Sequence, residues 1–319
     1  MKSRIAAALC LAVLIVAGCK PSTPSEPAGG KLRACAGIAP IGWFVSQIGG
    51  AHVQVDVIVG AGQSPHAYEP TARELKAAGS ALLYFGSRME FETQLARKLA
   101  AINPRLKVID ITARIPLRKM TEEELEAEEH EEAAGAHEAH EGHEAHEEHA
   151  AGAPDPHVWL NPRHGKIIAE NVAAALKEAD PAHAAEFDAN LAAVKAKLDA
   201  VDERIAQILA PFKGRQFMVY HPAFGYFGDA YGLKQVPVEV SGKEPSARDL
   251  AEFIKRAREA DVRIIFVQPQ FSTRSADMVA QSIGGAVVRM DDLAADYLKN
   301  LEDMADSLAR ALQSPPKGE

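Results

Sequence analysis

The chain has 319 residues, of which 47% are hydrophobic and 6% aromatic, enough to bury a substantial core and to form two domains. Its formal net charge is −9, but thirteen of its 44 acidic residues are glutamates within residues 121–150, which leaves 31 acidic residues against 35 basic ones elsewhere. No basic patch with interleaved aromatic residues is present, so nucleic acid is excluded as an expected partner.

The N-terminus has the pattern of an export signal. Lys2 and Arg4 precede the apolar run "IAAALCLAVLIV", which is too short for a membrane span and ends in "VAGC" at Cys19. This ending resembles a bacterial lipobox, which predicts a signal peptide at 1–18, acylation of Cys19 and a flexible linker at 19–31 that tethers the folded body to a membrane. The alternative is an ordinary signal peptide with a chance cysteine.

Once the signal peptide is removed and Cys19 is acylated, Cys35 is the one unmodified cysteine. An internal disulfide is therefore not possible, and the apolar context "LRACAGIAP" predicts a buried structural thiol.

Short apolar runs alternate with helical patterns in the first half of the chain. Four strands are predicted at 32–37, 53–59, 81–85 and 106–111, with helical segments at 73–79 and 91–102. This alternation is typical of parallel strands with crossover helices. His66, in "GQSPHAYEP", lies in a turn beyond the second strand, next to a proline that restricts the backbone.

Residues 121–153 contain mainly Glu, His, Ala and Gly, and predict a disordered insertion. The insertion carries half of the twelve histidines: His130, His137, His140, His143, His146 and His149. We expect these to bind metal weakly as an accessory, because a flexible chain loses entropy on binding. The alternative is a solvated acidic spacer. The repeat lacks the HExxH spacing of zinc hydrolases, since its histidines are three residues apart.

A long helix is predicted after His157, which lies in "PDPHVWLNP". Apolar residues from Phe187 to Ile208 recur at spacings of four and three, without glycine or proline between 182 and 210. This pattern predicts a stiff connecting helix at 183–211, although a coiled-coil seam would show a similar stripe.

A second set of strands is predicted at 215–220, 234–240, 262–268 and 286–290. The expected fold is therefore α/β, with two four-stranded parallel-sheet lobes, 32–182 and 212–319, joined by one rigid helix. His221 directly follows one of these strands and Asp291 another. Because ligands of open α/β sheets bind beyond the carboxyl ends of the strands, a site in the cleft between the lobes is expected.

The candidate ligands are His66, His157, His221 and Asp291, two from each lobe. Three nitrogens and one oxygen suit four-coordinate Zn²⁺, whereas Mn²⁺ prefers more oxygen. Each residue alone is weak support for a metal site, and Asp291 could equally cap the helix predicted after it.

The segments "GQSPHAYEP", "DPHVWLNP", "YHPAFGYF", "SGKEPSARDL" and "RMDDL", in this order, resemble the metal-specific solute-binding proteins of bacterial ABC importers, in particular their zinc branch. The resemblance covers about residues 32–312. It implies that His66, His157 and His221 are ligands of one transported Zn²⁺ and that Asp291 takes the acidic fourth position. It also implies delivery to an ABC permease and its ATPase. The chain departs from the family at Gln268, where glutamate is frequent.

The expected protein is a lipid-anchored monomer on the periplasmic or extracytoplasmic side of a bacterial membrane. It is not expected to be an enzyme, because no general base accompanies the candidate ligands. Two alternatives stay open: a manganese or iron carrier of the same family, and a periplasmic zinc buffer that is not coupled to transport.

Overall fold

The computed structural model describes residues 30–66, 68–121, 124, 154–237, 247–259, 262–271 and 274–313. The predicted signal peptide, Cys19, the six histidines of the insertion and positions 238–240 lie outside these residues. The chain divides into two compact units, Met1–Gly30 and Lys31–Glu319, and the described helices and strands belong to the second. The predicted boundaries of the lobes within that unit stay a prediction.

The first sheet has four parallel strands in the order β2-β1-β3-β4. They are β1 (Leu32–Ala36), β2 (Val53–Val57), β3 (Leu83–Gly86) and β4 (Lys107–Asp110), and the helices between them are α1 (Ala39–Gly49), α2 (Ala72–Ala78) and α3 (Glu90–Ile102). The central strand β1 is buried at Ala34, Cys35 and Ala36, as expected of a parallel sheet covered on both faces. The buried thiol predicted for Cys35 is confirmed.

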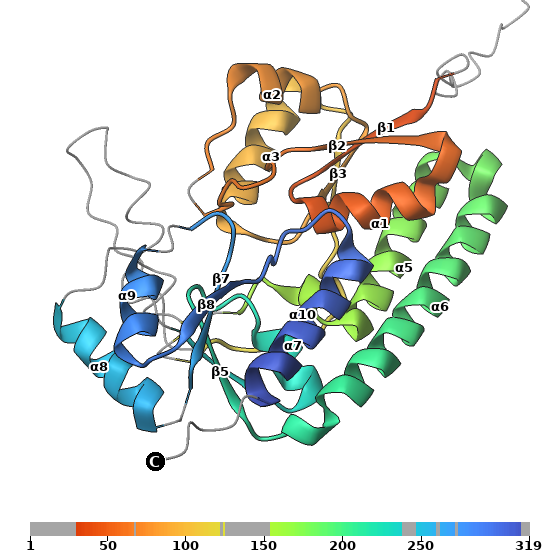
Figure 1. Cartoon of the computed structure of the whole chain (residues 1–319). Coiled ribbons are helices and arrows are strands. Elements are labelled where there is room, and N and C mark those ends of the chain that lie inside the picture. The colour runs from red at the N-terminus through yellow and green to blue at the C-terminus, as the bar shows by residue number, and fades with distance from the viewer. Residues whose placement is uncertain are drawn as a thin grey trace, which may run out of the picture. The chain divides into compact units, whose positions relative to one another are not determined.

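The second sheet repeats this topology with the order β6-β5-β7-β8, again all parallel. Its strands are β5 (Gln216–Val219), β6 (Lys234–Pro237), β7 (Ile264–Val267) and β8 (Ala286–Arg289), and its helices are α7 (Gly225–Tyr231), α8 (Ala247–Glu259) and α9 (Arg274–Ser282). Figure 1 shows α9 beside β7 and β8, with α8 next to α9. The predicted fold class is thus confirmed.

The long helix α6 (Ala184–Leu209) lies in the chain between the two sheets. It buries the predicted apolar stripe, including Phe187, Val194, Leu198 and Ile205. The stripe is covered within the chain by α5 (Pro162–Ala179), α10 (Tyr297–Gln313) and α1, so it needs no second copy of the chain (Figure 1). The sequence prediction did not include α5, which begins with Asn161 as its cap and Pro162 in its first turn.

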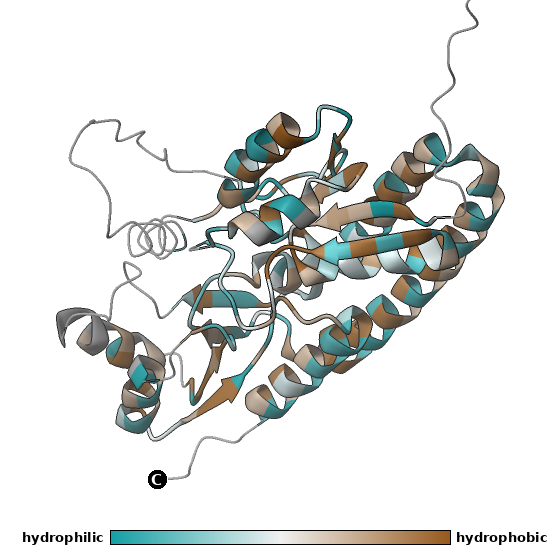
Figure 2. Ribbon diagram, turned by 90° about the horizontal axis from the view of Figure 1, so that it is seen from above, coloured by the Kyte–Doolittle hydropathy of each residue, from teal (hydrophilic) through white to brown (hydrophobic). Residues whose placement is uncertain are grey.

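The larger core cluster contains buried residues from both sheets and from α1, α5, α6 and α10. Phe44, Trp159 and Tyr297, all buried, belong to it, and in Figure 2 the strands carry hydrophobic residues, in brown, interrupted by hydrophilic ones, in teal. Such a continuous core stabilises the arrangement of the two sheets. Among the described residues, no helix combines the length and apolar character required to cross a bilayer.

Candidate metal site

Three of the four predicted ligands come together in the structure. His66, His157 and His221 each offer a ring nitrogen, and these atoms all lie within 4.8 Å of one another. The ring centroid of His66 lies 4.8 Å from that of His221 and 5.9 Å from that of His157. His66 follows β2 and His221 follows β5, so both lie beyond the carboxyl ends of strands, where open α/β sheets bind ligands.

The spacing of the two buried histidines fits a tetrahedral ion. The Nε2 atoms of His157 and His221 are 3.4 Å apart. Two nitrogens that each lie 2.0–2.1 Å from one tetrahedral Zn²⁺ are separated by about 3.3–3.4 Å. Both rings are 1% exposed, whereas His66 is half-buried. The arrangement therefore has the geometry of a partly preformed site to which His66 contributes from the more accessible side.

Asp155 holds the ring of His157. Its Oδ1 accepts from the backbone N–H of His157 and lies 2.9 Å from Nδ1 of the same residue. Burial raises the pKa of Asp155, but the hydrogen bond and charge of His157 and the charge of Arg118 outweigh it, and the pKa is lowered overall. Because an ionised carboxylate only accepts hydrogen bonds, Nδ1 carries the proton and Nε2 presents its lone pair to the site.

Gln268, which directly follows β7, holds the backbone of His221. Its Nε2 donates to the His221 carbonyl at 2.9 Å, and its Oε1 accepts from the His221 N–H at 3.3 Å. An amide is suited to this double contact because it both donates and accepts. The glutamine at this position, noted above as a departure from the family, thus fixes the chain at His221.

Neither Asp291 nor Asp292 is a member of the group of described side chains that converge with the three histidines. The Oδ1 of Asp291 accepts from the N–H of Leu293 at 2.8 Å, which is a contact within a turn and not the predicted helix cap, because the next helix, α10, begins only at Tyr297. The neighbouring Asp292 is 3% exposed and electrostatically coupled to His157 and His221. Burial raises the pKa of Asp292, and the charges of the two histidines oppose that shift.

Trp159 connects the segment that carries His157 with the segment that carries Asp292. It was not identified from the sequence. Its indole Nε1 donates to the carbonyl of Asp292 at 2.7 Å, and its ring makes an edge contact with His157. Tyr297 donates to the Trp159 carbonyl at 2.5 Å. The side chain of Asp292 is held in turn by Gln270, which donates to its Oδ1 at 2.8 Å. The signal available in the sequence was the aromatic residue two positions after a candidate ligand.

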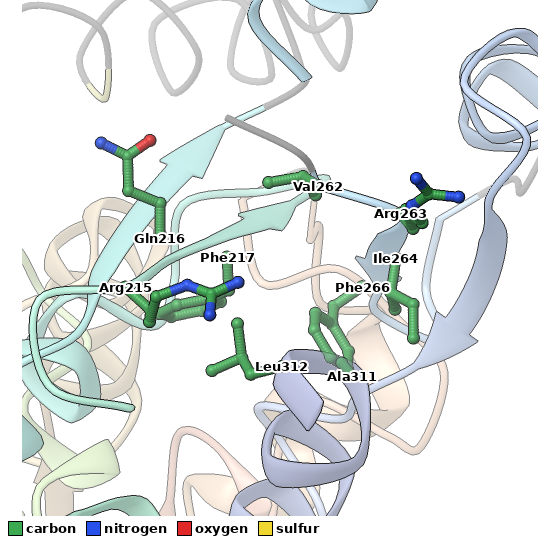
Figure 3. Close-up of a pocket in the computed structure, with 9 residues that line it drawn as sticks. All are labelled: Arg215, Gln216, Phe217, Val262, Arg263, Ile264, Phe266, Ala311 and Leu312. Carbon is green, nitrogen blue, oxygen red and sulfur yellow. The ribbon is translucent and has the colours of Figure 1, made fainter. Parts of the chain in front are cut away.

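A separate surface pocket lies at the other end of the second sheet. Arg215, Val262 and Arg263 line it at the amino ends of β5 and β7, together with Leu312 near the end of α10 (Figure 3). His221 follows the carboxyl end of β5, so this pocket is not the site of the three histidines.

Two parallel sheets with histidines that converge beyond the strand ends form the arrangement expected of a metal-specific solute-binding protein. The chain belongs to the family described as the periplasmic component A of the zinc-uptake complex, whose model matches residues 35–311. This is a family of transport components, which is not a class of enzymes.

Curated relatives agree with this membership. The chain is 32% identical to the high-affinity zinc uptake system protein ZnuA of Brucella abortus over 92% of its length and 93% of the relative's. It is 30% identical to ZnuA of Bacillus subtilis, covering 85% of this chain and 82% of the relative. It is also 28% identical to the zinc-binding lipoprotein AdcA of Streptococcus pneumoniae, but spans 57% of the length of that protein.

Solved structures give the same result. A crystal structure of ZnuA aligns with a TM-score of 0.78 and 35% identity, covering 89% of this chain and 100% of that one. A zinc-bound ZnuA deletion mutant aligns with a TM-score of 0.76 and 34% identity, covering 90% of this chain and 100% of that one.

Proposed function

We propose that this protein is the extracytoplasmic zinc-binding component of an ABC importer. It captures Zn²⁺ with His66, His157 and His221 and delivers the ion to a membrane permease driven by an ATPase. The observation that carries the proposal is the convergence of three imidazoles from distant parts of the chain, with a 3.4 Å separation of two Nε2 atoms. An all-nitrogen set of this kind favours Zn²⁺ over Mn²⁺, which prefers oxygen ligands.

For the fourth position we propose an oxygen from Asp292, or a water that it orders, in place of Asp291. Two features support this choice: Asp292 is 3% exposed, and the charges of His157 and His221 oppose the rise that burial causes in its pKa. The indole of Trp159 and the amide of Gln270 hold Asp292 in place.

Export and lipid anchoring through Cys19 belong to the same proposal and are supported by the N-terminal sequence pattern. The proposal also includes that the protein acts as a monomer. The histidines of the 121–153 insertion are proposed as weak accessory ligands that collect zinc near the site.

The test is a zinc titration against a competing chelator. His157→Ala should weaken binding by more than the roughly 10–100-fold typical of losing an outer partner of a ligand. Asp292→Asn should weaken it measurably, and Asp291→Asn, the matched control, should leave it near the wild-type value. Wild-type affinity in His157→Ala would exclude the proposed site, and a larger effect at Asp291 than at Asp292 would reverse the choice of aspartate.

Coupling to transport is tested in cells. Zinc-limited cells that lack this chain should recover zinc uptake with the wild-type gene and not with His157→Ala. Equal recovery with both genes would separate the protein from metal import.

A further inference from the structure

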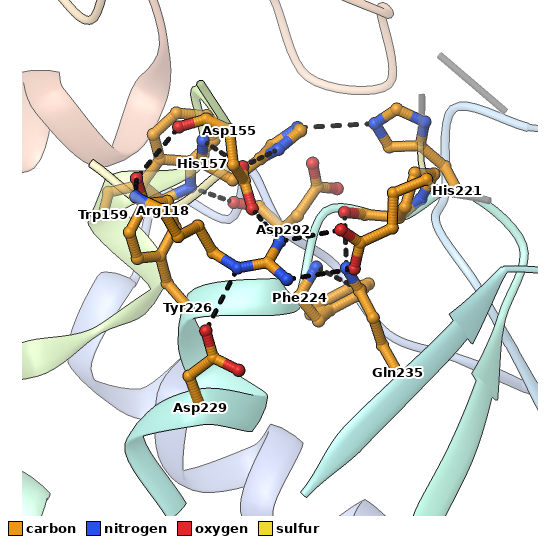
Figure 4. Close-up of polar contacts among 12 residues, drawn as sticks. Arg118, Asp155, His157, Trp159, His221, Phe224, Tyr226, Asp229, Gln235 and Asp292 are labelled. Atoms are coloured by element: carbon orange, nitrogen blue, oxygen red, sulfur yellow. Dashed lines mark hydrogen bonds and ion pairs between the residues drawn. The ribbon is translucent and has the colours of Figure 1, made fainter. Parts of the chain in front are cut away.

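Arg118, in the loop after β4, lies at the centre of a buried ionic network that neither the ligand set nor the family resemblance includes. Its guanidinium donates from Nη1 to Asp155 Oδ2 at 2.8 Å and to Glu124 Oε2 at 3.1 Å, and from Nε to Asp229 Oδ2 at 3.1 Å (Figure 4). The side chains of Asp155 and Glu124 are 0% and 4% exposed, so two of these three ion pairs are removed from solvent.

The carboxylate of Asp155 links this network to His157. One of its oxygens, Oδ2, contacts Arg118, and the other, Oδ1, contacts both Nδ1 and the backbone N–H of His157. The two oxygens belong to one rigid planar group, so the position of the guanidinium sets the direction in which Oδ1 meets the imidazole. Arg118 thus acts on the ring through a single intermediate residue.

The network also reaches the second lobe. The Tyr226 hydroxyl on α7 accepts a hydrogen bond from the backbone N–H of Arg118 at 3.0 Å and donates one to the backbone carbonyl of Asp155 at 3.1 Å. Gln235 on β6 donates to Glu124 at 2.8 Å. Asp229 is also on α7, so two residues of this helix hydrogen-bond to Arg118.

Gly225, the first residue of α7, leaves the space that the guanidinium fills. A Cβ at this position would lie 2.1 Å from Arg118 Nη1 and 2.8 Å from Asp155 Oδ2. Such distances are too short for non-bonded atoms, and the end of a long side chain moves more easily than backbone. A methyl group at position 225 would therefore displace the Arg118–Asp155 contact.

We propose that Arg118 is a positioning residue that couples α7 of the second lobe to the orientation of the His157 ring. While α7 is docked on Arg118, Asp155 holds His157 with Nε2 directed at the ion. Movement of α7 away from Arg118 loosens His157 and promotes release of the metal. The part of this inference that concerns the ion rests on the proposed function of His157 as a ligand.

The experiment compares Gly225→Ala, Arg118→Lys and the control Asp229→Asn in the full chain. Gly225→Ala keeps every charge in the network, and Arg118→Lys keeps the cation but lacks the fork that reaches several carboxylates at once. Asp229 is 63% exposed and does not contact Asp155 in the contacts above, so Asp229→Asn removes one arm of Arg118 and leaves the route to His157 intact.

Two readouts separate positioning from general stability. In the zinc-free protein, ¹⁵N NMR of labelled histidine should find the His157 proton on Nδ1 in the wild type and in Asp229→Asn, and shared between both nitrogens in Gly225→Ala. Zinc affinity should fall about 10–100-fold in Gly225→Ala, which is the range for lost outer partners, and by a smaller factor in Arg118→Lys. Urea unfolding checks that all three variants are folded.

The inference would be overturned if both Gly225→Ala and Arg118→Lys kept the His157 proton on Nδ1 and the zinc affinity of the wild type. It would also be overturned if Asp229→Asn changed these two quantities as much as Gly225→Ala does. If the wild-type protein itself bound no zinc, the proposed function would fail, and the NMR comparison would still decide whether Arg118 positions His157.

Discussion

The zinc-free protein should lose stability as the pH rises, because of one buried carboxyl group at the site-facing edge of the first sheet. Glu92, in the first turn of α3, is 3% exposed and accepts hydrogen bonds from Tyr84, Ser87 and Met89. Burial raises its pKa from 4.5 to about 7, although these hydrogen bonds favour the ionised form. The folded protein therefore retains a proton that the unfolded chain has released.

The sign and size follow from proton linkage. A folded-state pKa above the unfolded value gives stability that is complete below pH 4.5 and lost as the pH passes through 7. At 1.36 kcal/mol for each pKa unit, the shift corresponds to about 3 kcal/mol in full and about 2.5 kcal/mol between pH 5 and 8.

The assay is urea unfolding of the chelator-treated protein at pH 5 and 8, with Glu92→Gln and the exposed neighbour Glu90→Gln as a matched control. The free energy of unfolding of the wild type relative to Glu92→Gln should fall by about 2.5 kcal/mol over this range, and relative to Glu90→Gln it should stay nearly constant. A difference between wild type and Glu92→Gln that does not change with pH would refute the reasoning.

Three further predictions concern the site and its surroundings. Zinc affinity should fall steeply below pH 6.5, the reference pKa of histidine, because an imidazole must be neutral to bind the ion. Chelator competition measures this affinity, and an unchanged value at pH 5 would contradict histidine ligation. Trp159→Phe should lower the free energy of unfolding by about 2–4 kcal/mol, because it opens a cavity and leaves the Asp292 carbonyl without its donor. A loss below about 1 kcal/mol in urea denaturation would contradict a stabilising role of this hydrogen bond. Deletion of 126–152, which spares Glu124, should remove weak zinc equivalents in calorimetry and keep one tight site, and loss of the tight site would refute the accessory role.

Much of the fold follows from patterns that are local in the chain. Most strands of the described residues are short runs rich in apolar residues, which locate them, and the apolar periodicity of α6 locates that helix. Helix α5 was missing from the prediction although Ile168, Val172 and Leu176 recur every four residues and are buried. Its role as the partner of α6 depends on tertiary packing, which a single stripe does not specify.

The convergence of the three histidines was predictable to the extent that His66 and His221 lie beyond strand ends and all three lie beside prolines. Which of Asp291 and Asp292 is buried was not predictable, because adjacent residues in a turn point in different directions and the contacts with Leu293 and Trp159 depend on the tertiary structure. Arg118 gave no local signal, since its partners lie 6, 37 and 111 residues away in the chain.

The stability of the first lobe and the affinity of the site should depend on pH in opposite directions. Ionisation of Glu92 destabilises the zinc-free fold as the pH rises, while loss of protons from imidazoles strengthens zinc binding over the same range. Bound metal adds stability in proportion to the logarithm of its concentration relative to Kd. The zinc-loaded protein should therefore be the more stable form at neutral pH.

The most direct test of the central claim is the position of the metal in crystals of the protein loaded with one equivalent of zinc. Anomalous diffraction at the zinc edge should give one dominant peak within about 2.0–2.2 Å of a nitrogen from each of His66, His157 and His221. A dominant peak bound by fewer than three of these imidazoles, or located elsewhere on the chain, would contradict it.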